Sequence, residues 1–181
     1  MTYLLQHDSN GAPVLVTGRL VLRKPNERDW DAMATFWASD RSLMMGGPWD
    51  AETLRRELDD LYVQWNRHGF SLFTVTRKGS DQGLGGIGPF FPERYTEVEL
   101  GWSLWNVADE GQGLAFEAAE AARDWFFGTF GHATAVSYTD PENHRSHRLC
   151  ERLGGVVDPK AVHPFGDEPD QTYRYFAGGR A

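Results

Sequence analysis

Residues 109–119 read Asp109-Glu110-Gly111-Gln112-Gly113-Leu114-Ala115-Phe116-Glu117-Ala118-Ala119, and this stretch decides the fold. Two glycines lead directly into a segment rich in Ala and Glu, which favours a helix. Glycine lets loop N–H groups turn toward an anion, and a helix N-terminus adds unpaired N–H groups and the positive end of its dipole. The stretch therefore predicts a phosphate-binding loop whose donors are backbone groups of Gly111, Gln112, Gly113, Leu114 and Ala115.

Strands are predicted on both sides of this loop and its helix. Residues 97–105 alternate polar and apolar side chains and are rich in β-forming residues, and residues 133–139 form a second such segment. A helix over 113–127 is the long crossover that two parallel neighbours require. A shorter helix follows, with Asn143 as its expected N-cap and Gly154 as its expected stop.

The first half of the chain predicts an arm, a strand and two helices. Residues 1–13 are expected to form a loosely held arm, and residues 19–23 a strand. Asp29 is expected to cap a short helix, and Asp50 a longer one that ends at Gly69. Two further hairpins are expected. The first pairs residues 70–77 with 84–91 and is followed by a third antiparallel strand after residue 96, and the second pairs 156–157 with 172–176. The glycines at 83, 85, 86 and 88 favour a bulged or closely approached strand.

These segments, in this order, resemble the GNAT superfamily of acetyl-CoA-dependent N-acetyltransferases, and most closely its ribosomal-protein N-acetyltransferase branch. The resemblance covers most of the chain. The segments that carry it are Thr17 to Arg23 as the opening strand, Glu99-Leu100-Gly101-Trp102 as the central strand, Gly111 to Ala115 with Glu117-Ala118 as the pyrophosphate loop, and Asn143 through Ser146 to Gly154 as the closing helix. It implies an α/β (α+β) fold of the GNAT type, a mixed and mostly antiparallel sheet flanked by helices. A single domain over residues 1–181 is expected.

The resemblance also implies a reaction, which is acetyl transfer from acetyl-CoA to a primary amine of a protein N-terminus or a small molecule. Glu99, on the strand that feeds the loop, is the first candidate for the base, directly or through a water, if burial raises its pKa. A backbone N–H among Ser103, Leu104 and Trp105 would polarise the thioester carbonyl. Asn143 and Ser146 would contact the coenzyme.

Two positions depart from the family pattern. Glu110 stands where the loop usually opens with Arg, Gln or Trp, so binding is assigned to backbone amides. Cys150 stands where many members have the Tyr that protonates the leaving thiolate. Cys150 is therefore the candidate general acid, with Tyr138 and a water as competitors.

Composition excludes several other classes of protein. Eighteen Lys and Arg against 26 Asp and Glu give a net charge of −8, which disfavours nucleic acid and anionic membranes as direct partners. One cysteine cannot form an intramolecular disulfide, and no leader or membrane span is evident, so a cytoplasmic monomer or homodimer is expected. His144 and His147 have helical spacing but lack further ligands nearby, so no metal is expected.

Two alternatives and one open question remain at this point. The main rival function is a non-catalytic acyl-CoA-binding sensor or interaction module on the same fold. A nucleotide-binding oxidoreductase fits less well, because no glycine-rich loop follows the first strand. The acceptor amine is not identified, although residues 44–49 and Phe90-Phe91 are candidates to line its pocket.

Overall fold

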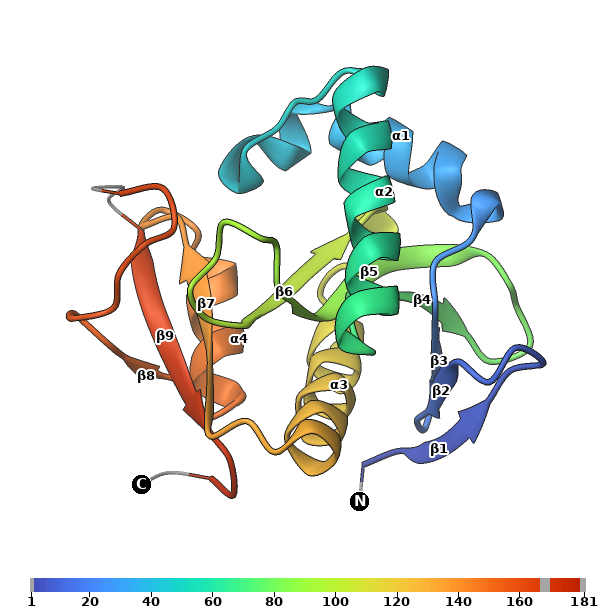
Figure 1. Cartoon of the computed structure of the whole chain (residues 1–181). Coiled ribbons are helices and arrows are strands. Elements are labelled where there is room, and N and C mark those ends of the chain that lie inside the picture. The colour runs from blue at the N-terminus through green and yellow to red at the C-terminus, as the bar shows by residue number, and fades with distance from the viewer. Residues whose placement is uncertain (1, 167–169, 180–181) are drawn as a thin grey trace.

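The computed structural model describes residues 2–166 and 170–179, and within these ranges nine strands form one sheet (Figure 1). The strand order is β1-β2-β3-β4-β5-β6-β7-β9-β8, and only β6 and β7 pair in parallel. The bounds are β1 Leu4–His7, β2 Pro13–Val16, β3 Leu20–Arg23, β4 Phe73–Arg77, β5 Gly83–Phe90, β6 Glu99–Leu104, β7 Thr134–Thr139, β8 Val156–Val157 and β9 Gln171–Phe176. The predicted mixed, mostly antiparallel sheet is confirmed.

Four α-helices flank this sheet, namely α1 Trp30–Trp37, α2 Ala51–His68, α3 Leu114–Phe130 and α4 His144–Arg152. Three short 3₁₀ helices accompany them, namely η1 Glu27–Asp29, η2 Asp40–Met45 and η3 Val107–Asp109. The predicted limits of α2 are confirmed, since the Asp50 carboxylate accepts the Thr53 N–H at 2.7 Å and Gly69 closes the helix at φ 78°. The predicted cap of α4 is also confirmed, because Asn143 accepts the Ser146 N–H at 3.1 Å.

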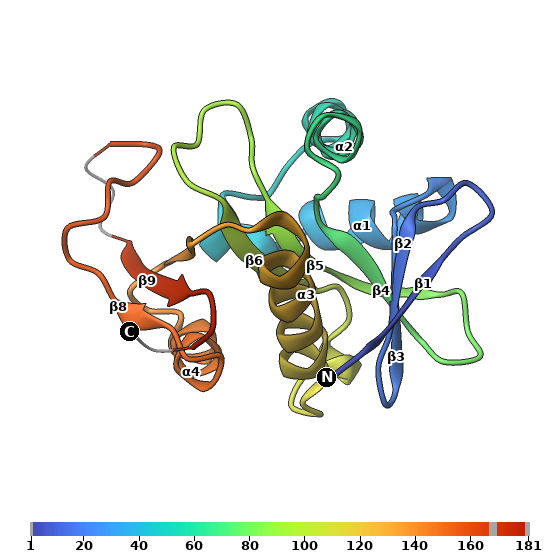
Figure 2. The same cartoon turned by 60° about the horizontal axis from the view of Figure 1, so that its bottom comes forward.

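The helices cover both faces of the sheet. Successive residues of a strand face opposite sides, and on β4 Phe73 and Val75 join the core that contains α3, whereas Thr74 contacts Asp29 at the start of α1. Helices α1 and α2 pack through a separate cluster of Met33, Phe36, Leu54, Leu58 and Trp105. Figure 1 shows α1 and α2 together at the top of the view. Figure 2 shows α3 in front of β5 and β6, with α2 at the top.

The expected loose arm at residues 1–13 is wrong, because Leu4–His7 pairs with β2 along its whole length. The Asp8 carboxylate closes the connecting turn by accepting the N–H groups of Asn10 at 2.8 Å and Ala12 at 2.9 Å. All four residues of β1 are exposed, so hydropathy gave no sign of this strand. Local turn chemistry and backbone pairing hold it instead.

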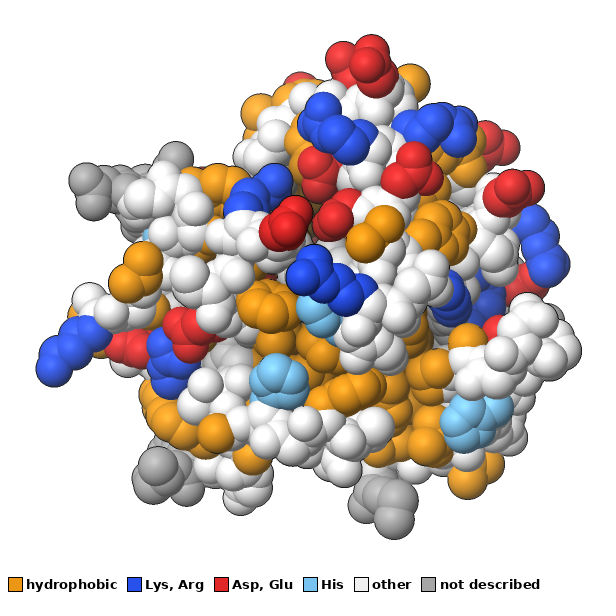
Figure 3. Space-filling model, in the orientation of Figure 1, with side chains coloured by type: hydrophobic (Ala, Val, Ile, Leu, Met, Phe, Trp, Pro, Cys, Tyr) orange, Lys and Arg blue, Asp and Glu red, His pale blue; other side chains and the backbone are white. Residues whose placement is uncertain are grey.

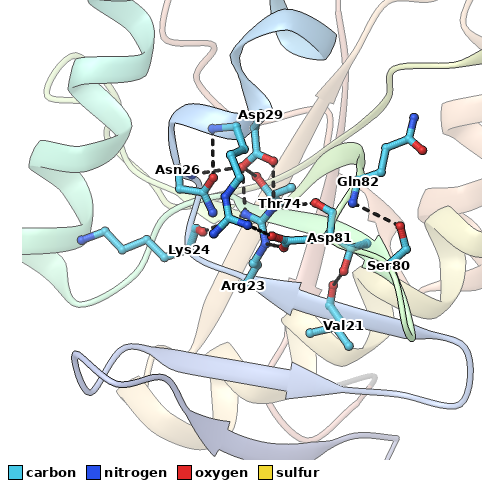
Figure 4. A network of polar contacts seen from close by, with 11 residues as sticks. Val21, Arg23, Lys24, Asn26, Asp29, Thr74, Ser80, Asp81 and Gln82 are labelled. Atoms are coloured by element: carbon cyan, nitrogen blue, oxygen red, sulfur yellow. Dashed lines mark hydrogen bonds and ion pairs between the residues drawn. The ribbon is translucent and has the colours of Figure 1, made fainter.

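The expected cap at Asp29 is also wrong, because its carboxylate is engaged in a buried polar network (Figure 4). Asp29 is 1% exposed and accepts two bonds from the Arg23 guanidinium at 2.8 Å each and one from the Thr74 hydroxyl at 2.8 Å. Asn26 is the residue that caps the η1 turn, through the N–H of Arg28. The network ties β3, β4 and the start of α1 together.

The glycine-rich strand β5 is bulged and closely approached, as predicted. The register of β4 against β5 shifts between Val75 and Thr76. A Cβ atom at Gly85 would lie 2.1 Å from the Ser103 carbonyl oxygen, which only glycine avoids. The close packing of β5 against β6 thus depends on Gly85 having no side chain.

Candidate active site

The parallel strands β6 and β7 separate soon after they meet. Their register contains the single pair Glu99 and Val136, supported by a bond from the Val136 N–H to the Val98 carbonyl at 2.9 Å. One residue further on, the Ser137 hydroxyl bonds the Leu100 carbonyl at 2.5 Å in place of a backbone donor. The sheet is therefore open between the C-terminal halves of these strands.

Two hollows meet at this opening. The inner cleft, of about 670 Å³, lies between β5–β6 and the α1–η2–α2 segment. The loop groove, of about 1250 Å³, runs past residues 109–116 and the start of α4. Both hollows are lined by Met44, Met45, Trp102, Ser103, Asn143 and Ser146. A molecule in one hollow can therefore touch a molecule in the other across Trp102 and Ser103.

The predicted phosphate loop lies along the loop groove. Gly111 and Gly113 have φ angles of 71° and 73°, a backbone region that favours glycine, and α3 begins at Leu114. Within the described part of the chain, the N–H groups of residues 111–116 donate to no protein acceptor. The free N–H groups and the α3 dipole suit an anion such as a pyrophosphate.

Side chains hold this loop in place from behind. Arg19 donates to the Gln112 carbonyl at 2.9 Å and pairs with Glu117, in the first turn of α3, at 2.6 Å. The Gln112 side chain donates to the Ala108 carbonyl at 2.5 Å and accepts from Arg77 at 3.1 Å. The Gln112 side chain thus braces the loop and does not line the groove. The loop is fixed before any ligand arrives.

Glu110, the residue that departs from the family pattern, bridges two arginines across the loop groove. One carboxylate oxygen accepts from Arg41 of η2 at 2.6 Å, and the other pairs with Arg145 of α4. Arg41 also donates to the backbone carbonyls of Leu104, at 2.8 Å, and Trp105. Glu110 therefore neutralises two cations that line the same groove as the loop.

Of the three backbone N–H groups predicted at the end of β6, only that of Leu104 faces the opening. The Trp105 N–H is bonded to the Leu84 carbonyl at 2.8 Å, so its expected role is wrong. Residues of an antiparallel strand alternate in the direction of their N–H groups, which directs Ser103 toward β5 as well, opposite its partner Gly86. The same alternation turns the Leu104 N–H toward the gap between β6 and β7.

Glu99 lines the inner cleft and is 9% exposed. Burial raises the pKa of its carboxyl to about 8, while interactions with the Tyr138 backbone and the Tyr95 side chain act in the opposite direction. Burial, followed by the charge of Glu99, likewise raises the pKa of Tyr95 above its usual range. The condition set for Glu99 as a base, a pKa raised by burial, is met.

Asn143 and Ser146 stand where the two hollows join. The Ser146 hydroxyl accepts a bond from the Trp102 indole N–H at 3.2 Å, and the Asn143 side chain caps α4. Both residues line both hollows. The geometry places them beside any molecule that reaches from the loop groove toward Glu99.

Cys150 lies outside both hollows, and its prediction as the general acid is wrong. It follows Ser146 by one helical turn on the same side of α4, but its short side chain ends in the core with no exposed surface. Burial raises the pKa of the thiol to about 12. Tyr138, a competitor for this role, does line the inner cleft, and its hydroxyl bonds the Val162 carbonyl at 3.3 Å.

Several residues of the site escaped sequence analysis. Arg41 and Tyr95 lie in segments without a recognisable motif, and only the fold brings Arg41 to the groove and Tyr95 to Glu99. Of the segments predicted to line the acceptor pocket, Met44, Met45, Gly46, Trp49 and Phe90 line the inner cleft.

Charged side chains of both signs are interspersed over α2 on the face shown in Figure 3. This face therefore presents no continuous acidic surface that could attract an amine from a distance. Within residues 2–166 and 170–179, none of the helices combines the length and the apolar character needed to cross a bilayer.

Comparisons with known proteins agree with this geometry. The family model described as an acetyltransferase (GNAT) domain matches residues 19–156. The crystal structure of an acetyltransferase from Agrobacterium tumefaciens superposes with a TM-score of 0.84 at 37% identity, covering 90% of this chain and 94% of that one. YnaD of Bacillus subtilis, named as an N-acetyltransferase, is 27% identical over 89% of this chain and 94% of its own length.

A more distant structure shares the fold alone. RimL, a ribosomal-protein alpha-N-acetyltransferase solved in complex with coenzyme A, superposes with a TM-score of 0.71 at 15% identity, covering 91% of this chain and 97% of that chain. This likeness shows the shared fold and does not assign the chain to the ribosomal-protein branch.

Proposed function

The chain belongs to the GNAT acetyltransferase family, and we propose that it transfers an acetyl group from acetyl-CoA to a primary amine bound in the inner cleft. The observation that carries this proposal is the junction of the two hollows at Trp102 and Ser103, with Glu99 on the inner side. The coenzyme would occupy the loop groove and supply an acetyl thioester. The amine would meet that thioester at the junction.

The loop groove fits such a coenzyme. The backbone N–H groups of Gly111 to Ala115 would bind the pyrophosphate, and Arg41 and Arg145 line the same groove. Asn143 and Ser146 would contact the arm that leads to the thioester. The Leu104 N–H would donate a hydrogen bond to the thioester oxygen and stabilise the negative charge that develops there.

Glu99 would remove the proton from the attacking amine. An alkylamine such as lysine has a pKa of about 10.4, so most of it is protonated at neutral pH and cannot attack. Glu99 and Ser103 lie four residues apart on β6, roughly 13 Å at the usual rise per residue, so the proton would pass through water. The new C–N bond forms as the C–S bond breaks.

The leaving thiolate would take its proton from a water at the junction. Cys150 is buried away from both hollows, and burial raises the pKa of Tyr138 to about 12, which makes it a poor acid at neutral pH. The wide loop groove allows solvent to reach the junction. Water is therefore the donor that the arrangement supports best.

Gly113→Val is expected to weaken acetyl-CoA binding by roughly 100-fold, because a β-branched residue at φ 73° would distort the loop and turn its N–H groups. Calorimetric titration of the purified variant measures the effect. Gly131→Val, at the other end of the same helix with φ 69°, introduces comparable backbone strain away from the groove and is the control. Equal affinity in a folded Gly113→Val protein would exclude the loop from coenzyme binding.

Glu110→Gln is expected to strengthen acetyl-CoA binding by roughly fivefold, since it removes a carboxylate charge worth on the order of 1 kcal/mol beside an anionic ligand. It also leaves Arg41 and Arg145 available to phosphate oxygens. The gain should shrink as salt is raised. Glu52→Gln makes the same change at an exposed side chain in the first turn of α2 and should leave acetyl-CoA affinity unchanged. Weaker binding in Glu110→Gln would mean that Glu110 is needed to hold the two arginines.

The function itself is tested by incubating the protein with acetyl-CoA and a mixed panel of small amines and peptides. Free thiol release and mass spectrometry of the acetylated amine report transfer. We expect release above background hydrolysis with at least one amine. A protein that binds acetyl-CoA but acetylates no member of a broad panel would instead support the sensor or interaction module.

A further inference from the structure

The inner cleft continues past the junction to an inner end beneath α1 and α2. Glu99, Gly101 and Ser103 of β6 and Trp105, the residue after its end, share one face, which is the face that α1 and α2 cover. The apolar side chains that α1 and α2 contribute to the lining of the cleft are Met33, Trp37, Leu54, Leu58 and Leu61, and α2 also contributes the polar Thr53, Arg56, Glu57, Asp60 and Gln64. A ligand whose amine lies at the junction beside Ser103 can therefore place the rest of its body against these apolar side chains.

Small residues on the sheet leave room for that body. Gly86 and Gly101 have no side chains, and Ser103 has a short one, so the floor of the cleft is shallow. At Gly86 an added Cβ would have its nearest neighbour at 3.8 Å, the Ser103 hydroxyl oxygen, and the φ angle there is not positive. An added Cβ would also meet Leu72 and Trp105 at 3.9 Å, and all of these are ordinary van der Waals contacts, so a small group fits at Gly86 without a clash.

The size and wall chemistry of the cleft favour a small molecule. A volume of about 670 Å³ lies in the range of roughly 300–1000 Å³ that small-ligand pockets span. Methionine side chains such as those of Met33, Met44 and Met45 are flexible and adapt to ligands of different outline.

One polar group marks the inner end. Trp105 is 8% exposed, and its indole Nε1 is the one buried side-chain nitrogen or oxygen among the described residues that has no hydrogen-bond partner. A buried donor without a partner is unfavourable, because it has lost its bond to water and gained none in return. A ligand atom that accepts a hydrogen bond, reached by a shift of the neighbouring methionine side chains, would remove this cost.

We propose that the acceptor is a small primary amine carried on an apolar body, with a hydrogen-bond-accepting atom at the end remote from the amine. The apolar body lies over Gly86 between the sheet and the α1–α2 walls, and the accepting atom meets the Trp105 indole N–H. This inference rests on the proposed function, because it takes the inner cleft as the site of the amine.

The experiment measures kcat/KM with saturating acetyl-CoA for three amines, namely ethanolamine, phenethylamine and para-methoxyphenethylamine. Phenethylamine should exceed ethanolamine by roughly 10- to 100-fold, the gain expected from burying an aromatic ring. The methoxy compound should exceed phenethylamine by roughly three- to tenfold, the gain from one hydrogen bond.

Two variants test the two parts of the site. Gly86→Val places methyl groups in the cleft and should raise the KM for phenethylamine at least tenfold, while coenzyme A affinity by calorimetry stays within about twofold. Gly128→Val, in α3 with open space around it, is the matched control. Trp105→Phe removes the indole N–H. The kcat/KM for para-methoxyphenethylamine divided by that for phenethylamine should therefore fall to about one, whereas Gly128→Val should keep the wild-type ratio.

The outcomes separate this inference from the proposed function. Transfer to amines without preference for an apolar body, or a Gly86→Val variant with unchanged KM, would overturn the inference and leave acetyl transfer intact. Preference for peptides over all small amines would overturn it as well. If Gly86→Val does not fold, Gly86→Ala with a smaller expected rise in KM takes its place. No transfer to any amine would instead contradict the proposed function.

Discussion

Glu99→Gln is expected to lower kcat by roughly 10²- to 10⁴-fold, because the amide cannot accept the proton of the attacking amine. The substitution keeps the size of the side chain, so the cleft and the coenzyme groove should be preserved. Acetyl-CoA affinity, measured by calorimetry, should change by less than about twofold, since Glu99 lines only the inner cleft. Steady-state kinetics with a saturating amine gives the effect on kcat.

The matched control is Glu93→Gln, which makes the same change on the loop between β5 and β6, at a side chain that is 91% exposed. It should keep wild-type kcat, because Glu93 does not line the cleft. A kcat in Glu99→Gln within threefold of wild type, with chemistry as the rate-limiting step, would exclude Glu99 as the base. The proton would then pass directly to water.

Asp29→Ala is expected to lower the free energy of unfolding by about 3 kcal/mol, the lower end of the range for breaking a buried ion pair. It leaves the Arg23 guanidinium, 14% exposed, with only the more exposed Asp81 as a carboxylate partner, and it removes the acceptor of the Thr74 hydroxyl. Urea denaturation measures the loss. Asp81→Ala, at a side chain that is 51% exposed, should lose less than about 1 kcal/mol.

The effect of Asp29 should also depend on pH. Burial acts to raise the pKa of this carboxyl, but bonds from Arg23, Asn26 and Thr74 outweigh it, and the net pKa lies below its ordinary value of 3.8. A lowered pKa means that the stabilisation is complete above that value and disappears as the pH falls through the folded-state pKa. The difference between wild type and Asp29→Ala should therefore shrink in strong acid. A loss no larger than that of Asp81→Ala at neutral pH would contradict the role of the network.

Local signals in the sequence predicted the parts of the fold that depend on local chemistry. The glycines at 111 and 113 need positive φ angles, and Asp50, Asn143 and Gly69 act through groups within a few residues. The alternation of polar and apolar side chains along residues 97–105 predicted the central strand, because it too is a pattern of neighbouring residues. Strand β1 escaped because its side chains are exposed and its stability comes from pairing with β2.

The candidate site was predictable only where backbone chemistry defines it. Glu110 was recognised as unusual, but its partners Arg41 and Arg145 lie 69 and 35 residues away, and no local pattern relates them. The burial that raises the pKa of Glu99 to about 8 comes from elements distant in sequence. At Cys150 the helical position was correct, but the length of the side chain decides whether it reaches the cleft.

The most direct test of Glu99 as the base of this acetyltransferase is the pH dependence of kcat in wild type and in Glu99→Gln, measured with saturating acetyl-CoA and amine. Burial raises the pKa of Glu99 to about 8, and the base must be ionised to act, so wild-type kcat should rise with pH and level off above about pH 8. In Glu99→Gln this rise should vanish, so that kcat is low and does not increase with pH in this range. A wild-type limb near the ordinary glutamate pKa of about 4.3, or a limb near pH 8 that persists in Glu99→Gln, would contradict the account.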